Sequence, residues 1–195
     1  MPSSRLRRAL RNARQALTRS EQRDHARRLA RHLTKSVRFR RARRVALYWP
    51  ADGEIDPRLL IDRDRGRQWF LPVLRRYPRK TLFFARWRPG EPLVPNRFGI
   101  PEPKRQGCRR RMALSLDLIL VPLVGFDDEG QRLGMGGGFY DRTLARLRRC
   151  RHWRRPCLIG AAHACQRVTR LRSRPWDVRL AAVMTEEGPR GRDRI

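Results

Sequence analysis

The stretch LVPLVGFDDEGQRLGMGGGFYDR, residues 120–142, decides how the rest of the chain is interpreted. The apolar run at 118–121 is typical of a strand buried on both faces of a sheet, and Pro122 is expected to end it. Residues 139–149 have the apolar spacing of an amphipathic helix. Between the two lie four glycines within five residues: Gly134, Gly136, Gly137 and Gly138. This order predicts an anion cradle, because loop amides and a helix N-terminus both favour negative charge.

The glycines alone are equally consistent with a tight turn. Each glycine costs roughly 1 kcal/mol relative to alanine in regular structure, so the run needs a reason. The spacing is neither that of a Walker loop nor the GxGxxG of a dinucleotide fold. Arg132 before the glycines and Asp141 after them favour phosphate, since arginine pairs with phosphate oxygens and a carboxylate can hold Mg²⁺.

The segment GQRLGMGGGFYDR, preceded by LVPLVGFD, resembles the ATP-binding segment of the 5-formyltetrahydrofolate cyclo-ligases, also called 5,10-methenyltetrahydrofolate synthetases. GMGGGFYD is similar to a bacterial branch of that family, whereas many members have GRGKGYYD. Met135 and Gly137 therefore stand where those members have a basic residue and a lysine. The resemblance implies ATP-dependent conversion of 5-formyltetrahydrofolate to 5,10-methenyltetrahydrofolate, ADP and phosphate through a phosphorylated formyl oxygen, with Mg²⁺.

The resemblance also implies which residues bind ATP. An amphipathic helix is expected from Arg5 to Leu17, and the family pattern K-x-x-L-R near its start is matched by Arg7, Leu10 and Arg11. Because the loop lysine is missing, the loop amides and Arg132 are expected to contribute more. Asp141 is expected to face Mg²⁺. The implied ATP-binding set is Arg7, Arg11, Arg132, Gly134, Met135, Gly136, Gly137, Gly138, Phe139, Tyr140 and Asp141.

The folate side is implied by two other loops. The expected strand 45–49 runs into WPADGEIDP, in which Asp56 is expected to cap a helix at 58–64. Glu54 matches the family glutamate that contacts the reacting end of the folate, and Trp49 is included in the substrate set. Phe98 precedes an x-I-P-x-P segment, where the family places a large residue against the pterin; the alternative is an aromatic that covers the core.

Further strands are predicted at 68–73, 81–87, 157–162 and 180–184, alternating with helical patterns. We therefore expect one α/β domain over residues 1–185, with a mainly parallel sheet between two helical layers and a disordered tail at 186–195. Ligands of such sheets bind beyond the carboxyl ends of the strands. The Glu54 loop and the glycine segment both follow strands, so both are expected to face one crevice.

The formal net charge of +30 raises a different possibility. A strongly basic chain can bind nucleic acid, and a catalytically weak family member acting as an RNA-binding protein is the alternative function. The 48 basic residues are spread along the whole sequence and only three are lysine, which does not favour a dedicated nucleic-acid face. A third possibility is a kinase or another ATP-using ligase for a different small acid.

No run of about 18 apolar residues and no secretory leader pattern is present, so a cytoplasmic protein without membrane contact is expected. A monomer is also expected. The four cysteines have irregular spacing without CxxC, which argues against a zinc ribbon and a disulfide framework. His163 has no neighbours in sequence with metal-ligand spacing. It is therefore as consistent with a structural role as with a catalytic one, and the predicted site excludes it.

Overall fold

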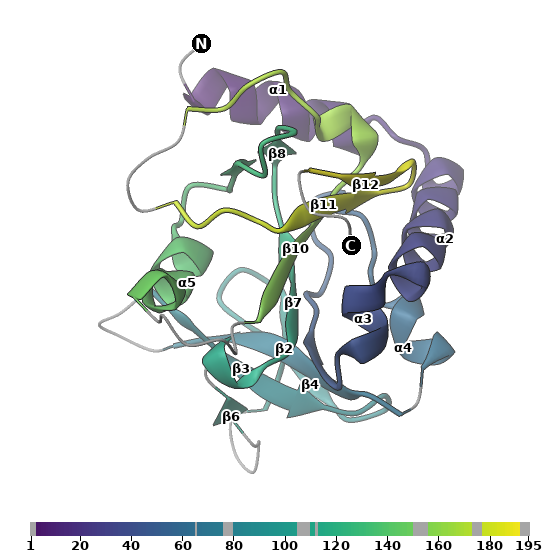
Figure 1. The fold of residues 1–195 in the computed structure, drawn as a ribbon, viewed down its shortest axis with the longest axis vertical. Helices are drawn as coiled ribbons and strands as arrows, with labels where there is room; N and C mark the ends of the chain where they lie inside the picture. Colours follow the sequence, from purple (N-terminus) through teal and green to yellow (C-terminus); the bar gives the residue numbers. More distant parts are fainter. Residues whose placement is uncertain are drawn as a thin grey trace.

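The computed structural model describes residues 3–64, 66–75, 80–104, 110–111, 113–149, 156–172 and 177–191. Within them, an eight-stranded sheet has the order β12-β11-β10-β7-β1-β2-β3-β6 (Figure 1). Its strands are β1 (Arg44–Ala46), β2 (Gln68–Leu74), β3 (Leu82–Trp87), β6 (Arg110–Arg111), β7 (Leu118–Pro122), β10 (Cys157–Ala161), β11 (Ala182–Thr185) and β12 (Gly188–Arg190). Two small hairpins add β4 (Leu93–Pro95) with β5 (Pro101–Pro103), and β8 (Gly125–Phe126) with β9 (Arg132–Leu133).

The centre of the sheet is parallel. Strands β11, β10, β7, β1 and β2 pair in parallel, whereas β12, β3 and β6 join antiparallel at the two edges. The expected mainly parallel α/β sheet is thereby confirmed. Pro122 is the last residue of β7 and lies opposite Ala161, in agreement with its expected role at the strand end.

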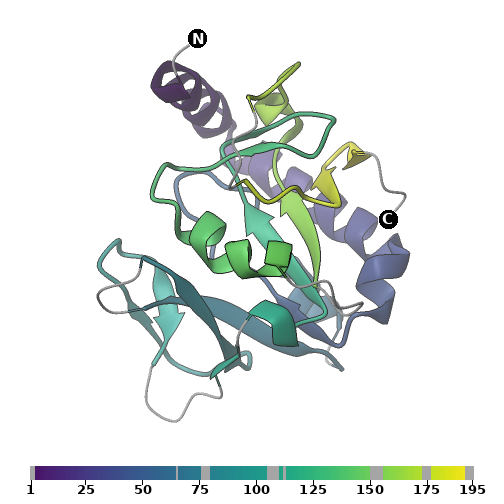
Figure 2. The same cartoon turned by 60° about the vertical axis from the view of Figure 1, so that its left-hand side comes forward.

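The helices form layers on both faces of the sheet. They are α1 (Ser3–Gln15), α2 (Arg19–Lys35), α3 (Val37–Arg41), α4 (Leu59–Arg63) and α5 (Phe139–Arg149), with short 3-10 turns η1 (Ala113–Ser115) and η2 (Ala164–Gln166). Figures 1 and 2 show α2, α3 and α4 on one side of the central strands and α5 on the other. The α2 helix begins with a capping box between Thr18 and Glu21, which satisfies backbone donors at its first turn.

The alternation of side chains along β7 divides the core into two parts. Leu118 and Leu120 pack with the α2, α3 and α4 side, whereas Ile119 and Val121 pack with the side that holds Leu144 of α5. All four are fully buried, as expected for a strand covered on both faces. The apolar run at residues 118–121 is thus a central strand between two hydrophobic layers.

The carboxyl ends of the parallel strands lie at one edge of the sheet, and α1 lies across that edge (Figure 1). The loop after β1 contains Asp52 and Glu54, and the chain after β7 leads through the β8–β9 hairpin to the glycine segment. The chain after β10 reaches His163, and the chain after β11 reaches Glu186. Residues far apart in sequence therefore meet at this edge.

Two expectations about chain ends and caps need correction. Disorder was expected from residue 186, but Glu186 is buried and Gly188–Arg190 pairs with β11 as strand β12. Residues 192–195 lie outside the described residues. The expected direct cap of the fourth helix by Asp56 is also wrong, because Arg58 occupies the N-cap without a side-chain cap bond. Asp56 instead accepts the Arg58 amide (2.9 Å) and pairs with the Arg58 guanidinium.

None of the described helices is both long and apolar enough to cross a membrane.

Candidate active site

The glycine segment is an open loop that ends at the first residue of α5. Gly136 and Gly138 have φ angles of 99° and 65°, a region that side chains with a Cβ rarely adopt. Met135, Gly136 and Gly137 are exposed, so their backbone is accessible to a ligand. The conformation therefore explains two of the glycines, and the exposed loop with the helix start is suited to an anion.

Arg7 brings α1 into contact with this loop. Its Nε donates a hydrogen bond to the carbonyl oxygen of Gly134 at 2.8 Å. A Cβ placed on Gly136 would lie 4.0 Å from the Arg7 guanidinium carbon. Two segments that are 127 residues apart thus form one wall, with a guanidinium beside the glycine backbone.

Arg132 and Asp141 lie on either side of the glycines and form an ion pair. The Arg132 side chain is only 4% exposed, and its Nε is buried without a hydrogen-bond acceptor among the described residues. An unpaired donor on a buried cation is costly unless a ligand satisfies it. The structure therefore brings together the two charged residues expected at phosphate and Mg²⁺, and leaves an Arg132 donor unsatisfied.

Arg11 forms an ion pair with the acidic loop after β1, and its predicted contact with ATP stays a prediction. Its Nε and Nη2 donate to the two carboxylate oxygens of Asp52, at 2.7 and 3.0 Å. The fully buried Arg14 adds bonds from Nη2 to Asp52 Oδ2 (2.7 Å) and from Nε to the Asp52 carbonyl oxygen (2.8 Å). These hydrogen bonds, that of Arg11 foremost, lower the pKa of Asp52 to about 2. Arg11 thus fastens α1 to the acidic loop, and the structure shows it engaged there.

Arg14 and Asp52 are not among the site residues predicted from the sequence. Asp52 has a φ of 53°, and it precedes Gly53, whose φ is 73°. An Asp-Gly pair in a loop is a turn signal that could have marked the position. Nothing in the sequence, however, indicated that Arg14 would be the buried partner, because the two residues are 38 positions apart.

Glu54 lies in the same loop but in a different environment. Its side chain is partly buried and accepts a hydrogen bond from the Ala51 amide at 3.1 Å. Burial raises the pKa of Glu54 to about 7, against the opposing charge of Arg14. Burial and the nearby Glu54 carboxylate also raise the pKa of Tyr140. Because such an effect requires proximity, the Glu54 loop lies near Tyr140 in the first turn of α5.

Phe98 lies at the rim of the glycine segment. Its side chain is 58% exposed, so the alternative of an aromatic that covers the core is wrong. Its ring meets Phe139 edge to face, with centroids 6.0 Å apart and an interplanar angle of 82°. The Arg97 guanidinium lies over both rings, at 4.9 and 5.8 Å from their centroids. An accessible aromatic surface therefore adjoins the loop expected to bind ATP.

Trp49 packs in another direction. Its ring meets Trp87 edge to face at 6.0 Å, and the Arg58 guanidinium carbon lies 4.4 Å above it. It also packs against the core on the α2, α3 and α4 side of the sheet. Among the described contacts none joins Trp49 to the glycine segment, so its place in the predicted substrate set has no support from the geometry.

A separate hollow of about 950 Å³ lies beside the β8–β9 hairpin. It is lined by Asp127, Glu129, Gln131, Thr169, Arg170, Leu171, Arg172 and Arg179. Asp127 stabilises its wall by accepting backbone hydrogen bonds from Gln131 (3.0 Å) and Leu171 (2.9 Å). None of the residues predicted to bind ATP or folate lines this hollow.

Several known proteins are similar to this chain in sequence and in fold. Residues 2–186 match the model of the 5-formyltetrahydrofolate cyclo-ligase family. The 5-formyltetrahydrofolate cyclo-ligases of Escherichia coli K12 and Haemophilus influenzae are 40% and 37% identical, covering 90% and 92% of this chain and 96% and 95% of their own length. The NMR structure of the Aquifex aeolicus 5,10-methenyltetrahydrofolate synthetase superposes with a TM-score of 0.81 at 30% identity, over 97% of this chain and 92% of that one. The chain therefore belongs to the 5-formyltetrahydrofolate cyclo-ligase family.

Proposed function

We propose that the protein converts 5-formyltetrahydrofolate to 5,10-methenyltetrahydrofolate with consumption of ATP and release of ADP and phosphate. The observation that carries the proposal is the meeting of the glycine segment with Arg7 and the buried Arg132 at the carboxyl edge of the sheet. Family membership supplies the substrate class. Glu54 and Phe98, on two further loops beside the segment, provide surfaces of different character for the folate.

The chemistry requires activation of a poor electrophile. Transfer of the γ-phosphoryl group to the formyl oxygen releases ADP and turns that oxygen into part of a good leaving group. N10 then attacks the formyl carbon, the C–O bond breaks, and phosphate departs as the N10 proton is lost. No protein nucleophile is needed, so the protein acts by positioning and by neutralising charge.

The phosphate-binding role falls to Arg7, Arg132 and the loop amides. The Arg132 Nε donor has no acceptor among the described residues, and guanidinium groups bind phosphate through charge-assisted hydrogen bonds. The open backbone at Gly136 and Gly137 can approach phosphate oxygens closely. These groups compensate for the missing loop lysine, because a second cation already lies against the loop at Arg7.

Mg²⁺ is the expected metal, and the donor set fits it. Asp141 offers a carboxylate in the first turn of α5, beside the loop amides. One carboxylate together with substrate phosphates is the set that Mg²⁺ prefers in nucleotide sites. When bound, the ion would neutralise charge on the transferred phosphoryl group. Arg132 holds the Asp141 carboxylate in place from the other side of the loop.

The folate-binding roles are divided between Glu54 and Phe98. A carboxylate with a raised pKa in a partly buried loop can orient a formamide or a pterin N–H by hydrogen bonding. The exposed Phe98 ring offers a flat apolar surface on which a pterin can stack. Tyr140 adjoins Phe139 in sequence, and the Glu54 charge raises the pKa of Tyr140, so this residue is a candidate for contact with the folate.

The test is a turnover assay of the purified protein with ATP, Mg²⁺ and 5-formyltetrahydrofolate, read as the absorbance of the methenyl product. Product should form only when all three are present. Asp141→Asn should reduce the rate by roughly 100-fold or more, as the loss of one transition-state contact commonly does. Asp128→Asn, in an exposed ion pair with Arg167, is the matched control and should leave the rate near normal. Absence of product from the folded protein would refute the proposal.

A further inference from the structure

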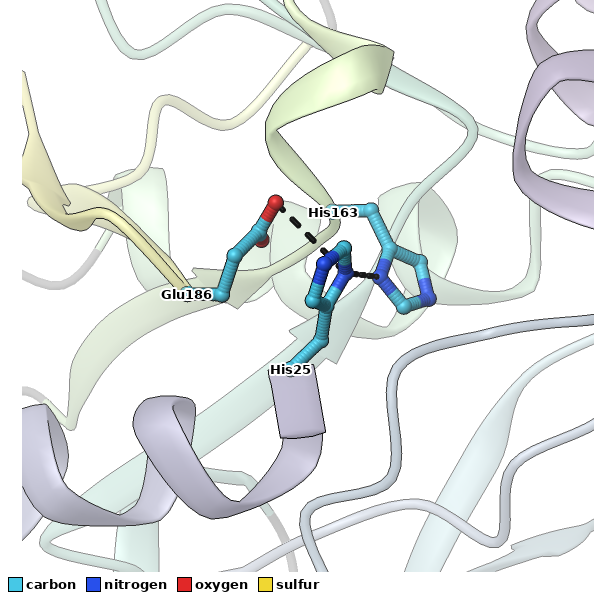
Figure 3. Close-up of side chains that lie close together, drawn as sticks. All are labelled: His25, His163 and Glu186. Atoms are coloured by element: carbon cyan, nitrogen blue, oxygen red, sulfur yellow. Dashed lines mark hydrogen bonds and ion pairs between the residues drawn. The ribbon is translucent and has the colours of Figure 1, made fainter. Parts of the chain in front are cut away.

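A second polar cluster lies at the carboxyl edge of the sheet, away from the glycine segment. His25 projects from α2, His163 follows β10, and Glu186 follows β11 (Figure 3). The Nδ1 atoms of the two histidines are 2.9 Å apart, and His25 Nδ1 is 3.5 Å from Glu186 Oε1. One donor atom from each residue lies within 4.8 Å of the other two. Two imidazoles and a carboxylate thus converge on one point.

The cluster is largely buried and held in position, with the His25 side chain 18% exposed. His163 is fully buried, and Glu186 is only 5% exposed. Both Glu186 carboxylate oxygens lie within hydrogen-bonding distance of the Ala164 amide (3.1 and 3.0 Å), and the Glu186 carbonyl oxygen contacts His32 Nε2 at 3.2 Å. His163 Nε2 has no hydrogen bond of standard geometry among the described residues, although the backbone of Gly53 lies beside the ring. Such a buried, oriented and incompletely satisfied group is uncommon in a site that serves packing alone.

We propose that His25, His163 and Glu186 form a binding site for a transition-metal cation of the zinc class. Zn²⁺ takes imidazole nitrogen and carboxylate oxygen at about 2.0–2.2 Å, so tetrahedral ligands lie about 3.4 Å apart. The observed separations of 2.9 and 3.5 Å lie on either side of that value. Three protein ligands leave a fourth position open for water or another small ligand.

The donor set separates this site from the one proposed for Mg²⁺. Mg²⁺ prefers oxygen ligands in octahedral geometry, whereas two imidazoles select zinc, cobalt or nickel. Asp141, by contrast, offers only oxygen and lies at the start of α5. The protein would therefore hold two kinds of cation at the same edge of the sheet, each matched to its ligands.

The position of the cluster suggests a structural effect. A bound ion would join α2 to the chain segments that leave β10 and β11, two neighbouring parallel strands. The backbone of Gly53 lies beside His163, and Gly53 precedes Glu54 in the acidic loop. The ion would thus fix the position of His163, which lies beside the acidic loop, without contacting the proposed ATP site.

The test is equilibrium dialysis of the metal-free protein against Zn²⁺ alone, followed by metal analysis and thermal unfolding. One zinc per chain and a raised Tm are expected, because an ion that binds only the folded state stabilises it. His25→Asn, which removes the imidazole, and Glu186→Gln, which keeps the size of the side chain, should each weaken zinc binding about 100-fold or more. Loss of even an outer-shell partner commonly costs 10- to about 100-fold. An excess of Mg²⁺ should not displace the zinc.

Two variants control for other zinc ligands. His32→Gln removes another α2 histidine but keeps a donor toward the Glu186 carbonyl oxygen, so zinc binding should persist. Cys165→Ser removes an exposed free thiol near Glu186, and binding should again persist. Absence of stoichiometric zinc, unchanged binding in both cluster variants, or loss only in Cys165→Ser would overturn the proposal. None of these measurements uses ATP or folate, so they are independent of the proposed reaction.

Discussion

Two carboxylates in the loop after β1 show how neighbouring residues acquire different chemistry. Asp52 receives guanidinium hydrogen bonds from Arg11 and Arg14, which lower its pKa to about 2. Glu54, two positions later, is partly buried and accepts a hydrogen bond from the Ala51 amide, and its pKa rises to about 7. Asp52 therefore stays charged and fastens the loop to α1, whereas Glu54 changes charge near neutral pH. This environment is compatible with the role proposed for Glu54, which is to orient the folate by hydrogen bonding.

Glu54→Gln should increase stability and decrease turnover. The pKa of Glu54 is higher in the folded protein (about 7) than its ordinary 4.5, so ionisation destabilises the fold as pH rises between these values. At pH 8 the variant should gain on the order of 2–3 kcal/mol in the free energy of unfolding, with little gain near pH 5. Urea unfolding at the two pH values measures this. Turnover should fall at least about 10-fold, as expected for loss of an orienting contact.

The matched control is Glu129→Gln, which changes an exposed carboxylate in the β8–β9 hairpin. It should leave the rate unchanged. A Glu54→Gln protein whose stability matches that of the unaltered protein at pH 8 would show that Glu54 is not destabilised by burial. Unchanged turnover would remove it from the substrate site.

At the level of elements, the main strands and the positions of the two loops proposed to bind substrates were predictable from the sequence. The apolar run at β7 and the alternating helical patterns were sufficient to place the Glu54 loop and the glycine segment at one edge. Long-range pairing was not predictable. The Arg14–Asp52 pair and the His25–His163–Glu186 cluster join residues from separate elements, and β12 depends on pairing with β11. Such contacts follow from the packing of elements, on which local spacing gives no information.

In the glycine segment, the effect of backbone conformation on stability can be separated from its effect on ATP binding. Gly136 and Gly90 have similar φ angles, 99° and 89°, and a Cβ at either would meet little or nothing in its surroundings. Gly136→Ala and Gly90→Ala should therefore lose similar stability, about 1–3 kcal/mol from backbone strain. Only Gly136 lies in the segment proposed to bind phosphate. Its variant alone should lose ATP affinity, by about 10-fold, in calorimetric titrations.

If both alanine variants bound ATP equally well, the loop backbone at Gly136 would not contact the nucleotide. If both lost affinity to the same degree, the loss would reflect general destabilisation, since Gly90 lies in an exposed turn before β4. Thermal unfolding of each variant, measured beside the titration, separates these outcomes.

For the whole molecule, the basic composition becomes partly explicable once the fold is known. The arginines of α1 include Arg7 on the glycine segment and Arg11 and Arg14 on Asp52. These side chains contact two loops of the candidate active site. Part of the positive charge that suggested nucleic-acid binding therefore forms contacts within the protein. This arrangement favours the ligase function over an RNA-binding role. The remaining charge still repels itself throughout the molecule, because 48 basic residues face only 18 acidic ones.

Stability should therefore increase with ionic strength. Raising monovalent salt from about 0.01 to 0.15 M shortens the Debye length from about 30 to 8 Å, which screens repulsion between distant arginines. Screening also weakens exposed pairs such as Arg167–Asp128, but such pairs contribute at most about 1 kcal/mol each. With a net charge of +30, relief of repulsion should be the larger effect, and Tm should rise. Thermal unfolding in sodium chloride and in potassium chloride measures this, and agreement between the salts identifies screening rather than ion binding. A Tm that falls with either salt would mean that local ion pairs outweigh the overall repulsion.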